Sequence, residues 1–143
     1  MIFFFDTSAL IKRYIAESGS EKVDDLFKIA ITIITSPVTK IEIYSTINRL
    51  RSEKALSEDD YSRLNEEIQY DFKYFKVLSF TQEIESLSIY LIEKHTLRTL
   101  DSIQLASCLS QKDFVNSFVV SDRKLKQAAE IENIHFIDPT EKR

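Results

Sequence analysis

The hydrophobic pattern begins with an uninterrupted apolar run, from Ile2 to Phe5, that ends on Asp6. The run has no 3.6-residue period and is too short for a helix, and its three phenylalanines favour a buried β-strand. Further short apolar or β-branched segments predict strands at residues 31–35, 76–80, 117–120 and 134–137. Five candidate strands are therefore spread along the chain.

The segments between these strands carry apolar residues at helical spacing. The longest stripe consists of Tyr61, Leu64, Ile68, Phe72 and Phe75. We predict helices over residues 7–18, 20–30, 37–52, 57–75, 100–112 and 122–130, and one more that begins after Thr81. Apolar residues surround the 100–112 helix on most sides, so this helix should be buried.

Residues with capping propensity stand where these helices begin and end. The candidate N-caps are Ser20, Ser36, Ser57, Thr81 and Thr99. Pro37 suits the first helical position after Ser36, and Asp60 gives the start at Ser57 the form of a capping box. Gly19 should end the first helix.

Strands that alternate with helices require crossover connections, which favour parallel pairing. Apolar strands without polar alternation are buried on both faces, so each face needs a cover of helices. We therefore expect an α/β fold, a three-layer α/β/α sandwich with a mainly parallel five-stranded sheet. By length, residues 1–143 should form a single domain. Ligands of such sheets bind beyond the carboxyl ends of the strands.

Composition excludes several classes of protein. The net charge of −4 argues against a nonspecific nucleic-acid coat protein, which needs an excess of Lys and Arg. The single cysteine, Cys108, excludes an intramolecular disulfide and a multi-cysteine zinc site, and its apolar neighbours favour a buried thiol. His95 and His135 are too far apart to indicate a His-rich metal site. With no membrane span or signal peptide recognisable, we expect a cytoplasmic protein.

Four carboxylates stand where this fold gathers polar side chains. Asp6 directly follows the first strand, and Asp122 follows the strand at 117–120, so both should lie at the same edge of the sheet. Asp101 falls in the first turn of the apolar helix. Glu42 falls in the second turn of the helix that follows the second strand.

Capping explains three of these residues as well as a functional role does. Asp6 and Asp122 can cap the helices that follow them, and Asp101 suits a helix N-terminus. Glu42 lies beyond the reach of the helix dipole, and its apolar neighbours predict burial. A buried carboxylate needs a partner, which is either Arg49 on the same helix row or a metal ion.

A convergent set of four carboxylates would repel itself without a multivalent cation. Ligation by Asp and Glu oxygens alone suits Mg²⁺ or Mn²⁺. These ions acidify a bound water and neutralise charge on phosphate oxygens, as phosphodiester hydrolysis requires. The sequence does not identify a general base, and metal-bound hydroxide could attack without one. The candidate metal-binding and catalytic residues are Asp6, Glu42, Asp101 and Asp122.

Polar neighbours of these carboxylates are candidates for supporting roles. Three hydroxyl residues flank the aspartates, namely Thr7, Ser8 and Ser121, although N-capping explains them equally well. Nearby basic residues either contact a nucleic-acid backbone or belong to solvated helix faces. They are Lys12, Arg13, Arg98, Arg123 and Lys124.

Four motifs, in chain order, resemble those of PIN-domain ribonucleases, most closely the VapC-type toxins of prokaryotic toxin–antitoxin pairs. They are "FFDTSALIKRY", "SPVTKIEIYSTINR", "LRTLDSIQLAS" and "FVVSDRKLKQAA". Each motif is weak alone, but the ordered set extends from Ile2 to about Pro139. The scarcity of glycine, with Gly19 alone, is a mild departure from the family.

The resemblance implies a PIN-like fold and a single-strand-specific endoribonuclease with Mg²⁺ or Mn²⁺ as cofactor. The family's acidic positions fall on Asp6, Glu42, Asp101 and Asp122, and its first hydroxyl falls on Thr7 or Ser8. The resemblance also implies a homodimer and a small VapB-like antitoxin that covers the site. It leaves open whether the chain is a toxin or a housekeeping nuclease in RNA processing.

Three other interpretations compete with this one. A haloacid-dehalogenase-type phosphatase needs a second carboxylate two residues after the first, where this chain has Ser8. A response-regulator receiver carries an acidic pair before its phosphorylated aspartate, and "IFFFDTS" lacks the pair. A non-catalytic interaction module with a PIN fold is the third, but four idle carboxylates would only destabilise it.

Overall fold

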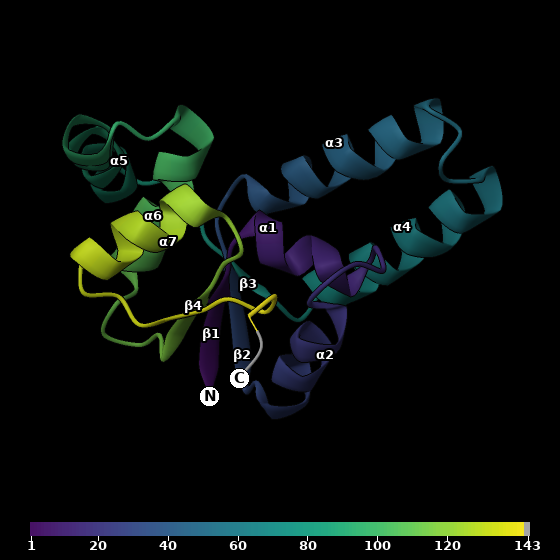
Figure 1. Ribbon diagram of the computed structural model, residues 1–143, viewed down its shortest axis with the longest axis horizontal. Helices are drawn as coiled ribbons and strands as arrows, with labels where there is room; N and C mark the ends of the chain where they lie inside the picture. The colour runs from purple at the N-terminus through teal and green to yellow at the C-terminus, as the bar shows by residue number, and fades with distance from the viewer. Residues whose placement is uncertain (142–143) are drawn as a thin grey trace.

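The computed structural model describes residues 1–141 and contains a five-stranded sheet between two layers of helices (Figure 1). The strands are β1 (Ile2–Phe5), β2 (Thr32–Thr35), β3 (Lys76–Val77), β4 (Ser117–Val119) and β5 (Phe136–Ile137). Their order is β3-β2-β1-β4-β5, and all neighbouring pairs are parallel. All five predicted strands are confirmed, although the two edge strands, which pair on one side only, are shorter than predicted.

Helices cover both faces of this sheet. Over residues 1–141 they are α1 (Thr7–Leu10), the 3₁₀ helix η1 (Ile11–Arg13), α2 (Ser20–Ile29), α3 (Thr39–Ser52), α4 (Glu58–Phe72), α5 (Gln82–His95), α6 (Thr99–Ser110) and α7 (Arg123–Ile131). Residues from α1 to α4 pack on one face and residues from α5 to α7 on the other. The predicted three-layer sandwich is confirmed. None of these helices is long and apolar enough to cross a membrane.

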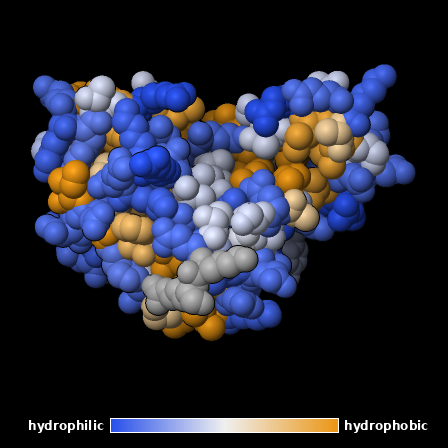
Figure 2. Space-filling model, viewed as in Figure 1, coloured by the Kyte–Doolittle hydropathy of each residue, from blue (hydrophilic) through white to orange (hydrophobic). Residues whose placement is uncertain are grey.

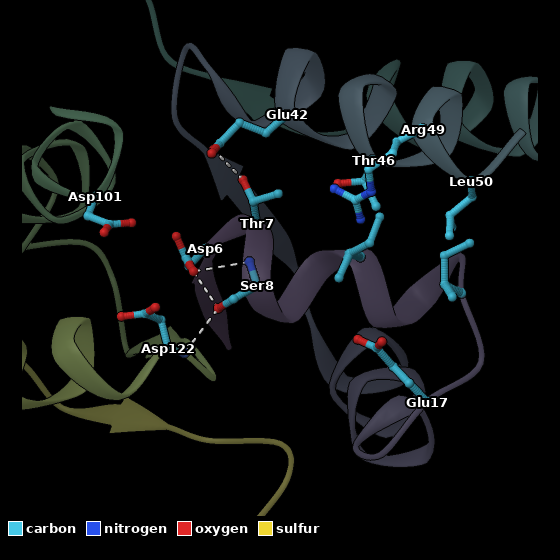
Figure 3. Close-up of a pocket in the computed structure, with 12 residues that line it drawn as sticks. Asp6, Thr7, Ser8, Glu17, Glu42, Thr46, Arg49, Leu50, Asp101 and Asp122 are labelled. Atoms are coloured by element: carbon cyan, nitrogen blue, oxygen red, sulfur yellow. Dashed lines mark hydrogen bonds between the residues drawn. The ribbon is translucent and has the colours of Figure 1, made fainter. Parts of the chain in front are cut away.

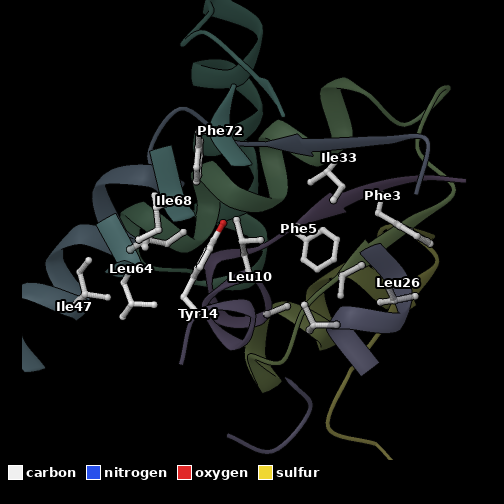
Figure 4. Packing of buried hydrophobic residues seen from close by; sticks show 14 residues of the cluster. Phe3, Phe5, Leu10, Tyr14, Leu26, Ile33, Ile47, Leu64, Ile68 and Phe72 are labelled. Atoms are coloured by element: carbon white, nitrogen blue, oxygen red, sulfur yellow. The ribbon is translucent and has the colours of Figure 1, made fainter. Parts of the chain in front are cut away.

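The central strand β1 supplies side chains to both layers. Phe3 and Phe5 are fully buried in the core formed with α1 to α4 (Figure 4). Phe4 points the opposite way, as strand geometry requires, and packs against Phe118 with ring centroids 5.8 Å apart. Each such buried side chain stabilises the fold by roughly 1.5–3 kcal/mol. The strand therefore gives Asp6, the next residue, a rigid base.

Helices α3 and α4 form a hairpin that projects from the body of the molecule (Figure 1). Ile47, Leu64 and Ile68 are buried within the hairpin (Figure 4). Figure 2 shows a hollow between this hairpin and the α5–α7 side, with hydrophobic surface on the inner flank of the hairpin. Glu42 lies at the base of the hairpin, beside the sheet.

Two of the predicted N-caps are confirmed by hydrogen bonds. The hydroxyl of Ser57 accepts from the Asp60 N–H at 3.1 Å, and the hydroxyl of Thr81 accepts from the Ile84 N–H at 3.2 Å. Thr99 as N-cap is wrong, because it is already the first helical residue of α6 and Arg98 holds the cap position. Capping propensity thus identified the turn but missed the cap by one residue.

Ser20 as N-cap is also wrong, because Gly19 is the cap of α2, with a left-handed φ of 97°. The predicted 7–18 helix is correspondingly shorter and ends in η1 at Arg13. Tyr14 turns inward there, and its hydroxyl donates to Asp71 at 2.8 Å. After Arg13 the chain is therefore not helical as predicted, and Tyr14 contacts α4 instead.

Helix α3 begins two residues later than predicted, at Thr39 rather than Pro37. The hydroxyl of Ser36 accepts from the Val38 N–H at 3.2 Å, within a turn that precedes the helix. The ends of α4 and α6 differ from the prediction by no more than three residues. The shift in α3 matters most, because it changes the position of Glu42 in its helix.

Candidate functional site

The four predicted carboxylates line one pocket of about 340 Å³ at the carboxyl edge of the sheet (Figure 3). We call it the carboxylate pocket; Asp6, Glu42, Asp101 and Asp122 define it. It continues along α3 to Arg49 and Leu50. Among residues 1–141, no three Asp, Glu, His or Cys side chains are grouped closely enough to hold one metal ion as they stand.

Asp6 is the most deeply buried of the four, with 3% of its surface exposed. It caps α1, because its Oδ2 accepts from the Ser8 N–H at 3.0 Å and from the Ser8 hydroxyl. Burial raises the pKa of Asp6 to about 7; the bonds from Ser8 oppose this rise, and the nearby negative charges of Glu42 and Asp101 add to it. A cation in the pocket would favour its ionised form.

Asp122 reaches the pocket from the turn between β4 and α7. It caps α7, because its Oδ1 accepts from the Leu125 N–H at 2.9 Å. The hydroxyl of Ser8 accepts from the Ser121 N–H at 3.0 Å and from the Asp122 N–H at 3.3 Å. Capping and pocket lining are therefore compatible in Asp6 and Asp122, since each cap uses only one carboxylate oxygen.

Glu42 is half-buried, and its Oε1 accepts from the Thr7 hydroxyl at 2.7 Å and from the Gln104 amide at 2.8 Å. The prediction of a second-turn position is wrong, because α3 begins at Thr39 and Glu42 lies in its first turn. The expected alternative partner, Arg49, forms no ion pair in the described part of the chain and lines the far end of the pocket, exposed to solvent. Hydroxyl and amide donors, rather than Arg49, therefore hold Oε1 of this carboxylate.

Asp101 lies half-buried in the first turn of α6 and points toward the pocket (Figure 3). Burial and the negative charge of Asp122 raise its pKa, against the positive charges of Arg98 and Lys124. Within residues 1–141 its carboxylate accepts no hydrogen bond. It is therefore the least constrained member of the pocket.

The carboxylates share an arrangement suited to oxygen ligation. Asp6 Oδ1, Glu42 Oε2 and Asp122 Oδ2 accept no hydrogen bond from the described residues, while the second oxygen of each is held by the protein. Such outer bonds orient the carboxylates of metal sites. The pocket therefore presents four carboxylates with unengaged oxygens, the ligand type of hard divalent cations.

Gln104 was not among the residues predicted from the sequence; it is buried in α6 and contacts Thr7, Thr39 and Glu42. A signal for it existed in the sequence. Gln104 is a large polar residue in an otherwise apolar helix, three residues after Asp101, and therefore on the same helix face.

The remaining hydroxyl candidate, Ser121, has a buried side-chain oxygen with no hydrogen-bond partner in the described chain. Among the basic candidates, Lys12 pairs with Glu17 at 3.0 Å. Arg13 pairs with Asp24 and Asp71, each at 3.3 Å, and lines a different pocket. The structure does not bring Lys12 and Arg13 to the carboxylate pocket.

The other three basic candidates lie on the opposite side of the pocket. Arg98 is exposed and borders a recess shared with Glu42 and Asp101. Lys124 donates to the Thr96 carbonyl at 2.7 Å, and Arg123 is exposed at the start of α7. Besides Arg49 at the far end of the pocket, positive charge near the carboxylates therefore comes from the starts of α6 and α7.

Comparison with known families decides the relationship of this chain. The family model described as "PIN domain" matches residues 3–132, a span that includes all four pocket carboxylates. The protein belongs to the PIN-domain family. PIN domains are typically nucleases, and the family is generally metal-dependent. The resemblance inferred from the four motifs is confirmed at the level of the family.

Solved structures share the fold of this PIN domain along nearly its whole length. A toxin–antitoxin complex from Klebsiella pneumoniae has a TM-score of 0.70 at 17% identity, over 97% of this chain and 98% of the other. FitAcB from Neisseria gonorrhoeae has a TM-score of 0.73 at 16% identity, with the same coverage. The structure of VapBC2 from Rickettsia felis, bound to a promoter DNA fragment, has a TM-score of 0.65 at 14% identity. The match covers 96% of this chain and 98% of the other. A search of curated proteins gave no match.

Proposed function

We propose that this PIN domain is a metal-dependent endoribonuclease that cleaves single-stranded RNA, and that it is the toxin of a toxin–antitoxin pair. The observation that carries the proposal is the carboxylate pocket, whose acidic residues all keep oxygens unengaged by the protein. Residues 1–143 would act as one nuclease domain in the cytoplasm. The choice of RNA as substrate rests on the family relationship.

The residues present fit a Mg²⁺ or Mn²⁺ ion. Asp6, Glu42, Asp101 and Asp122 would hold it, because hard cations prefer carboxylate oxygens and this pocket contains neither cysteine nor histidine. When bound, the ion supplies Lewis acidity toward phosphate oxygens and acidifies water.

The protein's own groups would position the substrate. Arg98, exposed next to Asp101, can contact a phosphate of the RNA backbone, and Arg123 and Lys124 extend the positive charge along α7. Ser121 is less suited to a supporting role, because its hydroxyl oxygen is buried and the residue is not among those that line the pocket. Lys12 and Arg13 are less suited to RNA contact, because both are already paired with carboxylates.

The cleavage proposal is tested with purified protein and single-stranded RNA in Mg²⁺ or Mn²⁺. We expect cleavage by the wild type and a loss of activity in Asp6→Asn and Asp101→Asn. The matched control is Asp25→Asn, because Asp25 is an exposed residue of α2 remote from the pocket. Unchanged activity in both pocket variants would overturn the assignment.

We further propose a small VapB-like antitoxin as partner and a homodimer as the assembly. Support for the antitoxin comes from the similar solved structures, which include a toxin–antitoxin complex, while the homodimer rests on the resemblance to VapC-type toxins. Expression of the chain should arrest growth, and co-expression of the cognate antitoxin should relieve the arrest. Metal-dependent cleavage without growth arrest would favour a housekeeping nuclease instead, and light scattering would establish the oligomeric state.

A further inference from the structure

Gln104 is a buried amide next to the carboxylate pocket, with 1% of its surface exposed. A buried amide without hydrogen bonds costs several kcal/mol, so its contacts must satisfy its donors and its acceptor. Its neighbours in α6, Ile103 and Leu105, are also buried but have no polar side-chain groups. Gln104 therefore differs from these neighbours by the hydrogen bonds that its amide makes next to the pocket.

Three side chains surround the amide of Gln104. Its Nε2 carries two N–H donors, which three acceptors share: Glu42 Oε1 at 2.8 Å, the Thr7 hydroxyl at 2.9 Å and the Thr39 hydroxyl at 3.0 Å. Its Oε1 accepts from the Thr39 hydroxyl at 3.4 Å, and that hydroxyl also lies 3.0 Å from the hydroxyl of Ser36. The amide is held from behind by Thr39 and faces Glu42.

Both hydrogen bonds to Glu42 converge on one oxygen atom. Gln104 and Thr7 each donate to Oε1, at 2.8 Å and 2.7 Å, while Oε2 accepts nothing from the described chain. Because a carboxylate is planar, holding Oε1 in place restricts the direction in which Oε2 points. Outer donors orient the ligands of metal sites in the same way.

Gln104 also links two helices that carry carboxylates. It lies three residues after Asp101 on α6, and therefore one helical turn away on the same face, while its acceptor Glu42 belongs to α3. In the described structure, no other hydrogen bond joins a side chain of α6 directly to Glu42. The amide therefore connects α6 with the first turn of α3.

We propose that Gln104 is a positioning residue, which holds Glu42 through Oε1 so that Oε2 is presented to a divalent cation in the pocket. This inference rests on the proposed metal-dependent function. Glutamine suits the role because its uncharged amide supplies two N–H donors and one acceptor. A methionine of similar length would supply no donor, and a glutamate would add a negative charge beside Glu42.

The first experiment measures Mn²⁺ affinity without RNA, by calorimetric titration, and then kcat and KM for RNA. We expect Gln104→Met and Gln104→Glu to weaken Mn²⁺ binding by about 10- to 100-fold. The RNA KM at saturating Mn²⁺ should stay unchanged, since Gln104 does not face the solvent. The matched control is Gln127→Met, because Gln127 is exposed on α7 and makes no side-chain hydrogen bond in the described chain.

The outcomes separate this inference from the proposed function. If wild-type protein binds no Mn²⁺, the proposed metal dependence fails. If the wild type binds Mn²⁺ and a folded Gln104→Met variant binds it equally well, the positioning role is wrong while the proposed function stands.

A measurement on unaltered protein covers the case in which the variants fail to fold. In a Mg²⁺ titration followed by NMR, the side-chain amide signals of Gln104 should shift together with the backbone signal of Asp101. Unmoved Gln104 signals, with a shifted Asp101 signal, would overturn the positioning role.

Discussion

The hydroxyl of Ser8 accepts the backbone N–H of Asp122 at 3.3 Å, although the two residues are 114 positions apart. The same hydroxyl donates to the carboxylate of Asp6. One small side chain therefore connects the ends of β1 and β4, which pair in parallel at the centre of the sheet. The two aspartates of these strand ends share a single hydrogen-bond bridge.

Ser8→Ala should destabilise the protein and weaken cleavage. Without the hydroxyl, the N–H groups of Ser121 and Asp122 lose their acceptor, and Asp6 keeps only the Ser8 N–H as donor. An unsatisfied buried group costs about 1–3 kcal/mol, and urea unfolding should show a loss of this size.

Ser121→Ala is the matched control in the same turn. The Ser121 hydroxyl is buried and has no partner among residues 1–141, so its removal breaks no hydrogen bond. Its free energy of unfolding should stay within about 0.5 kcal/mol of the wild type. An equal loss in both variants would show that the bridge through Ser8 is not the cause.

Without metal, the protein should lose stability as pH rises from about 4 to about 7. Burial raises the pKa of Asp6 from 3.8 to about 7, so the unfolded chain releases this proton before the folded protein does. The stabilisation by protonated Asp6 is fully present below the pKa of 3.8 that the residue has in the unfolded chain. It is lost as the pH rises through the pKa of about 7 in the folded protein. At about 1.4 kcal/mol per pKa unit, the loss is on the order of 4 kcal/mol.

Urea unfolding in a chelator at pH 5 and pH 8 measures this effect. Asp6→Asn cannot ionise, so its stability should change less between the two pH values than that of the wild type. Asp25→Asn, at an exposed position, should keep the wild-type difference. Added Mg²⁺ should reduce the difference, because a cation stabilises the ionised carboxylate; a wild-type difference that equals that of Asp6→Asn would contradict the prediction.

Gly19→Ala should destabilise the start of α2. Gly19 has a φ of 97°, and a Cβ at this position would lie 3.1 Å from the backbone carbonyl of Pro139. A left-handed conformation costs a residue with a Cβ about 1–2 kcal/mol before this close contact is added. Thermal unfolding should show a lower Tm for Gly19→Ala than for Ser18→Ala, which changes an exposed neighbouring residue. Equal Tm values for the two variants would contradict the predicted backbone strain at position 19.

Cys108 should resist thiol reagents in the folded protein. Its side chain is fully enclosed, and burial, followed by the nearby Asp6, raises the pKa of its thiol. The thiolate is the reactive form, so labelling with a maleimide should require unfolding. Mass spectrometry should find unlabelled native protein and one label per chain in urea; rapid labelling of the native state would contradict the buried position.

The sequence correctly predicted helix N-caps whose hydrogen bonds join residues close together in the chain. Ser57 and Thr81 cap their helices as predicted, because the hydrogen bond from a cap spans only three residues. The signal at Ser20 failed because the turn before α2 needs a left-handed residue, which Gly19 supplies. The Ser20 hydroxyl instead accepts from the Glu17 N–H at 3.0 Å, within the turn that precedes the helix.

Hydrophobic patterning by itself determined the five strands, the two helical layers and the strand-end positions of Asp6 and Asp122, because burial and alternation are properties of short segments. Only the tertiary structure decided how each carboxylate is held. Glu42 bonds Thr7 and Gln104 instead of Arg49, since these side chains meet only after α1, α3 and α6 have packed around the sheet. Hydrogen bonds between distant segments depend on distances that no local pattern encodes.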